Sequence, residues 1–241
     1  MDNQFHDLKK LHLGCGPITP SGWINLDGSW NAWVSKHSQL RGILKTFHLA
    51  PAKAFDAVWS SNVLVHDVRK GLPFEANSLS AIYASHMLEH LYLADAKRLL
   101  AECYRVLEPN GVLRIVVPDL RALVMEYLDA LTDKSSIQSS RVEAGYPADV
   151  LNEKMLFRDI EAPRGSLAFR LYTALQDFHS HKWMYDSNSL IGHITEAGFE
   201  AVESKQFLQS QIIDIEQVEM ADRVLNGAGI CVEGIKSVLL T

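Results

Sequence analysis

The sequence predicts one α/β domain built on a doubly wound, mostly parallel β-sheet. Short apolar segments of strand type alternate with amphipathic helical segments, most clearly over residues 60–125. The first strand runs directly into a turn with two glycines, Gly14-Cys15-Gly16, as in sheets that bind ligands at the carboxyl ends of parallel strands. A chain of 241 residues with 47% hydrophobic side chains can bury a sizeable core, so we expect residues 1–241 to form a single domain.

Seven segments are predicted as strands, and the first five are short and apolar. In chain order they are residues 11–13, 23–27, 62–67, 80–84, 112–117, 199–207 and 229–236. Pro118 ends the fifth strand, because proline cannot continue a ladder of backbone hydrogen bonds. The last two segments are joined by a loop, which predicts a closing hairpin with an antiparallel strand.

Helical segments connect the later strands. Apolar side chains over residues 99–107 fall at helical spacing, and the turn at residues 108–111 ends that helix before the fifth strand. Asp119 is placed to cap a further helix over residues 120–131. Another helix is expected near residues 187–197, followed by a turn at Gly198.

The periodicity weakens after the fifth strand. Residues 132–183 contain Ser-rich, Gly-Tyr-Pro and Pro-Arg-Gly stretches around two helical segments. We interpret this region as a helical insertion over one end of the sheet. We expect it to act as a partly mobile lid, because an insertion after a parallel strand emerges at the edge where ligands bind.

Composition excludes several partners. The 23 Lys and Arg residues against 29 Asp and Glu give a net charge of −6, which offers no long-range attraction to nucleic acid or anionic lipid. Cys15, Cys103 and Cys231 have neither disulfide nor zinc-site spacing, which suits a reducing compartment. No apolar run has the length of a signal peptide or a membrane span. We therefore expect a cytoplasmic protein without a membrane span.

Polar groups or glycines follow three successive strands. Gly14 and Gly16 follow the first, Asp27 ends the second, and Asp67 ends the third. A carboxylate at the second position is suited to accept hydrogen bonds from both hydroxyls of a ribose. Thr19 stands where a dinucleotide fingerprint has its third glycine, which disfavours NAD and FAD.

The order of the longer motifs resembles that of class I S-adenosylmethionine-dependent methyltransferases, and within them the type 11 group. The motifs are Leu11-His-Leu-Gly-Cys-Gly-Pro17, Asp67 before Gly71-Leu-Pro-Phe74, Tyr83-Ala-Ser-His-Met-Leu-Glu-His-Leu91, Arg105-Val-Leu-Glu-Pro-Asn-Gly111 and the stretch from Arg114 to Leu120. The resemblance covers residues 8–125 strongly and residues 181–236 more weakly. It implies a Rossmann-like fold with a seven-stranded sheet and S-adenosylmethionine as the cofactor.

The resemblance also implies roles for individual residues. The backbone of Gly14, Cys15 and Gly16 would line the methionine part of the cofactor. Asp27 would hold the ribose, Asp67 the adenine amino group, and Ser85 would add a main-chain contact.

One departure from the family stands out. Only residues 17–26 separate the glycine turn from Asp27, whereas the family usually has a full helix there. We expect residues 29–47 to cover the sheet instead.

Three residues are candidates for catalysis: His86, Asp119 and His181. His86 and His90 are spaced as i and i+4, but the His-Glu-x-x-His order of zinc proteases is absent, so we expect no metal there and a structural role for His90. Helix capping explains Asp119 equally well. His181 and the aromatic residue Trp183 form either a half-buried hinge or a substrate wall with a general base.

We therefore expect methyl transfer from S-adenosylmethionine to a small-molecule or glycan acceptor at a hydroxyl group, the sugar being suggested by analogy with related enzymes. Two alternatives remain. One is an oxidoreductase or epimerase that uses a bound nucleotide. The other is a regulatory protein that binds the cofactor without turnover.

Overall fold

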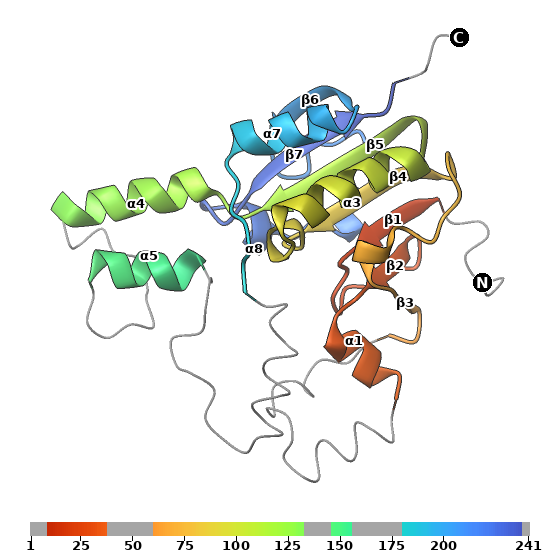
Figure 1. The fold of residues 1–241 in the computed structure, drawn as a ribbon, viewed down its shortest axis with the longest axis horizontal. Coiled ribbons are helices and arrows are strands. Elements are labelled where there is room, and N and C mark those ends of the chain that lie inside the picture. Colours follow the sequence, from red (N-terminus) through yellow and green to blue (C-terminus); the bar gives the residue numbers. More distant parts are fainter. Residues whose placement is uncertain (1–8, 38–59, 133–145, 156–179, 238–241) are drawn as a thin grey trace.

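The computed structural model describes residues 9–37, 60–132, 146–155 and 180–237 and confirms the predicted fold class (Figure 1). Its centre is a seven-stranded sheet with the strand order β3-β2-β1-β4-β5-β7-β6. The first five strands pair in parallel, while β7 runs antiparallel to both β5 and β6. The expected closing hairpin is therefore present at the β6 edge.

The strands lie close to the predicted segments. They are β1 (Lys10–Leu13), β2 (Ile24–Asp27), β3 (Val63–Val65), β4 (Leu79–Ser85), β5 (Leu107–Val117), β6 (Glu200–Lys205) and β7 (Ile230–Ile235). The main difference is the start of β5, which includes the turn predicted at residues 108–111. Asn110 has a φ of 64° there, and the pairing of β4 with β5 shifts register between Leu79 and Ala81.

Two of the longer helices, α3 and α7, cover one face of the sheet (Figure 1). The α-helices are α1 (Trp30–Ser35), α3 (Leu93–Val106), α4 (Leu120–Thr132), α5 (Pro147–Met155), α7 (Ser187–Glu196) and α8 (Ala221–Val224), and the 3-10 helices are η3 (Val68–Lys70), η4 (Leu88–His90) and η7 (Ile215–Gln217). α3 and α7 pack apolar side chains such as Leu100 and Leu190 against strand residues Leu113 and Val232 in the larger core cluster. The spacing that predicted α3 is thus the spacing of its buried face.

The opposite face of the sheet is covered in a different way. No helix connects β1 to β2, as the short spacing predicted, and residues 14–23 form only turns and loop. In the described part of the chain, Ile212, Ile215 and Val218 from the C-terminal region pack on this face against Trp23 and Tyr83. A segment distant in sequence therefore covers the surface that the missing helix leaves open.

Parts of the two remaining predictions lie outside the described residues. α1 begins the segment that we expected to cover the sheet, and its Ala32 packs near the β3 edge with Cys15 and Val63, but residues 38–47 are not described. Of the insertion over residues 132–183, only residues 132, 146–155 and 180–183 are described, and α5 packs beside α4 (Figure 1). None of the helices in the described residues combines the length and the apolar character needed to cross a bilayer.

Candidate functional site

A cavity of about 490 Å³ lies at the carboxyl ends of β1 to β4. Its lining includes all six residues predicted to bind the cofactor and one of the three catalytic candidates. They are Gly14, Cys15, Gly16, Asp27, Asp67, Ser85 and His86. Four parallel strands therefore bring together residues that are up to 72 positions apart, since His86 follows Gly14 by that number.

The glycine turn is held against the neighbouring strand. The backbone N–H groups of Gly14 and Cys15 donate to the carbonyl of Leu26 at 2.8 and 3.1 Å. Gly14 has a φ of 68°, and a Cβ atom there would lie 2.6 Å from Cγ of Met87. Both the left-handed conformation and the close approach of Met87 thus require glycine at this position.

Asp27 is buried with 7% of its surface exposed, and backbone amides hold its carboxylate. Oδ2 accepts a hydrogen bond from the N–H of Gly16 at 3.0 Å, and Oδ1 accepts one from the N–H of Ser29 at 2.8 Å. Each carboxylate oxygen retains acceptor capacity. A buried carboxylate at the cavity wall, without a cationic partner among the described residues, fits the two ribose hydroxyls of the implied cofactor.

Asp67 is in a different environment. It caps η3 by accepting from the N–H of Arg69 at 3.1 Å, and the Arg69 guanidinium bonds both carboxylate oxygens at 2.8 and 2.9 Å. These bonds hold the pKa of the Asp67 carboxyl below its usual range. Asp67 is therefore both a helix cap and an ion-pair partner, and an adenine amino group would share this carboxylate with Arg69.

The cavity also has walls that sequence reasoning missed. His12 on β1 is a lining residue, and burial lowers the pKa of its imidazole to about 4. Val218, Met220 and Arg223 reach the cavity from the C-terminal region. The polar residue within an apolar strand could have indicated His12, whereas no local pattern marks the C-terminal residues.

Cys15 contributes backbone rather than a reactive thiol. Its side chain is buried, and burial raises the pKa of the thiol. Because the thiolate is the nucleophilic form of cysteine, this side chain is unreactive at neutral pH.

His86 follows β4 and faces the cavity. Its Nε2 donates to the carbonyl of Arg223 at 2.9 Å, and its Nδ1 lies 3.5 Å from Oε1 of Glu89. The residue has a φ of 50°, an uncommon conformation for a side chain of this size. His86 therefore joins the β4 end of the cavity to the C-terminal region and to a buried carboxylate.

The other two catalytic candidates are not lining residues of this cavity. Asp119 caps α4, since its Oδ1 accepts from the N–H of Arg121 at 2.9 Å. His181 is 6% exposed, and its Nε2 lies 4.0 Å from Oε1 of Glu89. Burial lowers the pKa of its imidazole.

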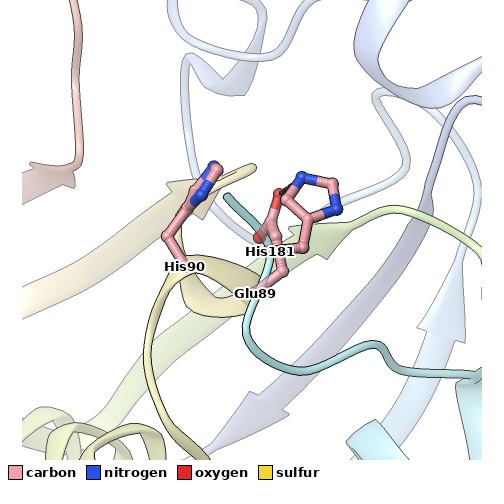
Figure 2. A group of neighbouring side chains, drawn as sticks. All are labelled: Glu89, His90 and His181. Carbon is pink, nitrogen blue, oxygen red and sulfur yellow. Dashed lines mark ion pairs between the residues drawn. The ribbon is translucent and has the colours of Figure 1, made fainter. Parts of the chain in front are cut away.

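His90 connects His181 to the cavity. The two rings meet edge to face with centroids 4.9 Å apart, and His90 lines the cavity. Figure 2 shows Glu89 and His90 on η4 with His181 on the segment that precedes α7. Three histidines thus surround Glu89 beside the cavity.

Residues 11–115 match the family model described as a methyltransferase domain. No curated protein matches the chain.

Solved structures with similar folds share little sequence. A S-adenosylmethionine-dependent methyltransferase of Archaeoglobus fulgidus is 15% identical with a TM-score of 0.46, over 97% of this chain and 88% of that one. A complex of the Haloferax volcanii Trm112 methyltransferase activator with a methyltransferase gives 14% identity and a TM-score of 0.44, over 95% and 82%. An S-adenosylmethionine-dependent methyltransferase of Thermotoga maritima is 16% identical with a TM-score of 0.43, over 95% of this chain and 82% of that one.

Proposed function

We propose that this S-adenosylmethionine-dependent methyltransferase transfers its methyl group to a hydroxyl of a small-molecule or glycan acceptor. The observation that carries the proposal is the composition of one cavity. It combines a glycine turn and a buried carboxylate at one end with the imidazoles of His86 and His90 at the other. The first pair suits the cofactor, and the second suits an acceptor that must lose a proton.

The order of the strands orients the cofactor in this proposal. With the ribose at Asp27 on β2 and the adenine toward Asp67 after β3, the methionine part extends over the glycine turn of β1 toward Ser85 on β4. The methyl group then lies at the β4 end, where His86 and His90 line the cavity. Because the two glycines of the turn carry no side chain, the cofactor can approach the backbone of the turn closely.

When bound, the cofactor supplies an electrophilic methyl group on a sulfonium. The chain contributes mainly position, because holding two reactants at near-attack distance is worth up to about 7 to 11 kcal/mol. A hydroxyl acceptor also needs a proton acceptor. We assign that role to His86, which lines the cavity beside the buried Glu89, and we assign Asp119 to helix capping. His181 is not a lining residue of the cavity and packs against His90.

We propose that two exposed aromatic side chains, close in the chain to His90 and His181 and outside the cavity lining, contact a sugar acceptor. Trp183 is 43% exposed and Tyr92 is 64% exposed. The backbone N–H of Trp183 donates to the backbone carbonyl of Glu89. This hydrogen bond fixes the backbone of Trp183 next to η4. Aromatic faces of this kind can stack on sugar rings while their polar atoms stay hydrated.

The test is an acceptor screen with S-adenosylmethionine carrying a labelled methyl group. Sugars and nucleotide sugars, simple alcohols, amines and carboxylates are compared for formation of S-adenosylhomocysteine and for labelled product. We expect a hydroxyl compound to be methylated, with a product stable to amine-specific reagents and to mild base. Methylation of amines or carboxylates alone would overturn the proposal.

A further inference from the structure

Glu89 is a fully buried carboxylate, and no described residue donates a hydrogen bond to it. The side chain is 0% exposed, and within the described ranges neither Oε1 nor Oε2 has a hydrogen-bond partner. Two imidazole nitrogens lie within ion-pair distance of its Oε1. They are Nδ1 of His86 at 3.5 Å and Nε2 of His181 at 4.0 Å. Burial of an unpaired carboxylate costs several kcal/mol, so a positive group must accompany it in the folded protein.

Backbone contacts fix this cluster in place. The N–H groups of Lys182 and Trp183 donate to the carbonyl of Glu89 at 2.7 and 3.2 Å. These two bonds join η4 to the segment that carries His181. The candidate ligand atoms of Glu89, His90 and His181 all lie within 4.8 Å of one another (Figure 2).

The hydrogen bonds of two histidines determine where their lone pairs lie. Nδ1 of His90 is 3.2 Å from the carbonyl of Ser180, and a carbonyl can only accept, so Nδ1 carries the hydrogen and Nε2 the lone pair. By the same reasoning Nε2 of His86 donates to the carbonyl of Arg223, which leaves the lone pair of the neutral ring on Nδ1. That lone pair faces Oε1 of Glu89 at 3.5 Å. The lone pair on Nδ1 and the negative carboxylate oxygen repel each other unless a cation or a proton lies near both.

We propose that Glu89, His90 and His181 bind a divalent transition-metal ion of the zinc type beside the cofactor cavity. One carboxylate oxygen and two imidazole nitrogens are the donor set of many such sites. The Ser180 carbonyl is the outer partner that metal-binding histidines usually have. Bond lengths of about 2.0–2.2 Å require the three donors to lie closer together than they do now, so metal binding must draw the three side chains inward.

The sequence could not have indicated this set. His86 and His90 lack the order of a zinc-protease motif, which led us to expect no metal. The third ligand is instead His181, and its distance of 91 positions from His90 follows no local spacing rule.

The location of the ion also suggests its use. Because His90 lines the cavity, an open coordination position would face the acceptor, where an ion lowers the pKa of a bound hydroxyl. This use depends on the proposed hydroxyl acceptor, whereas the metal site does not.

The experiment is a cobalt titration of the whole chain after removal of metals by a chelator. We expect one Co²⁺ per chain, with visible absorption bands of nitrogen and oxygen coordination and displacement by Zn²⁺. Failure of the wild-type chain to bind either ion stoichiometrically would overturn the proposal, and a shared proton among the imidazoles would then accompany Glu89.

Variants test which residues bind the ion. Glu89→Gln and His181→Ala should each weaken Co²⁺ binding by at least about 100-fold, more than outer-shell substitutions usually do. The matched controls are Glu196→Gln and His193→Ala, a surface carboxylate and imidazole 3.4 Å apart, which should bind as the wild type does. Wild-type affinity in both site variants would overturn the assignment.

Separate readouts distinguish this proposal from the proposed function. Circular dichroism and S-adenosylhomocysteine binding show whether each variant is folded, and His90→Ala replaces any variant that is not. Cobalt binding without methylation of any hydroxyl would leave the metal site standing and refute the acceptor. Methylation of a hydroxyl by a chain that binds no metal would refute the metal site alone.

Discussion

Two carboxylates that occupy similar positions in the sequence are held by different groups. Asp27 ends β2 and Asp67 follows β3, yet backbone amides hold Asp27 while the guanidinium of Arg69 pairs with Asp67. The sequence placed both at the edge of the sheet because strands have a fixed direction. It could not show which one Arg69 would engage, since that depends on a side-chain conformation.

The first prediction concerns the carboxylate of Asp27. Asp27→Asn should weaken S-adenosylhomocysteine binding by about 10-fold to 100-fold, because a hydrogen bond to a charged acceptor contributes about 1.5–3 kcal/mol. The measurement is isothermal titration calorimetry. Asp129→Asn, an exposed change on α4 outside the cavity lining, serves as the control. Equal affinities for the two variants would refute the ribose assignment.

The second prediction concerns His12 and acid stability. Burial lowers the pKa of His12 to about 4 in the folded chain, whereas an unfolded histidine has a pKa near 6.5. Between these values only the unfolded chain takes up the proton, so the stability contributed by neutral His12 is complete above pH 6.5 and is lost as the pH falls toward 4. The expected loss between pH 7 and pH 5 is about 2 kcal/mol.

Urea unfolding of the ligand-free chain measures this loss. The buried His181 also has a lowered pKa and contributes in the same direction, so the wild type alone does not isolate His12. His12→Gln removes only the His12 contribution. The difference in unfolding free energy between wild type and variant should therefore shrink by about 2 kcal/mol from pH 7 to pH 5. A constant difference would contradict the assignment.

At the scale of elements, the sequence predicted strands better than the connections that cover them. The apolar segments and the glycine turn located the first five strands because short buried strands have a clear local signature. The largely exposed strand β6 was located instead from its place after the turn at Gly198. The missing helix between β1 and β2 was also visible from the short spacing. What replaces it was not, because Ile212, Ile215 and Val218 pack on that face through contacts between distant segments.

A buried ion cluster anchors this C-terminal region to the sheet. Arg114 on β5 is fully buried and bonds Glu219 at 2.7 and 3.0 Å and Glu233 on β7 at 3.3 Å. It also donates to the carbonyls of Gln206 and Gln209. Nε, Nη1 and Nη2 of Arg114 thus all have acceptors. These bonds hold the segment that supplies Met220 and Arg223 to the cavity next to β5.

The third prediction tests this anchor. Glu219→Ala should lower the unfolding free energy by about 3 kcal/mol or more, because removing one partner of a buried ion pair leaves the other uncompensated. Glu216→Ala, an exposed change in the short helix η7 that precedes Glu219, should stay within about 0.5 kcal/mol of the wild type. Chemical unfolding measures both. Similar values for the two variants would show that the cluster does not stabilise the region.

At the scale of the whole molecule, the site forms where three parts of the chain converge. Residues after β1 to β4 form the floor of the cavity, residues 218–223 form one wall, and the segment around His181 lies behind His90. Contacts between these parts are made only in the folded state. A ligand that bridges them should therefore stabilise the fold as a whole.

The fourth prediction is that S-adenosylhomocysteine raises the melting temperature. A ligand that binds only the folded state stabilises it by about 2.7 kcal/mol at 100 times its dissociation constant. For a chain of this size each kcal/mol shifts the midpoint by about 2–4 °C, so the expected rise is about 5–10 °C. The Asp27→Asn chain should show a smaller rise at the same ligand concentration, because its affinity is lower. NAD is the matched nucleotide control, and it should have no effect, since Thr19 replaces the third glycine of a dinucleotide site. A melt that NAD shifts and millimolar S-adenosylhomocysteine does not would contradict the assignment of this cavity.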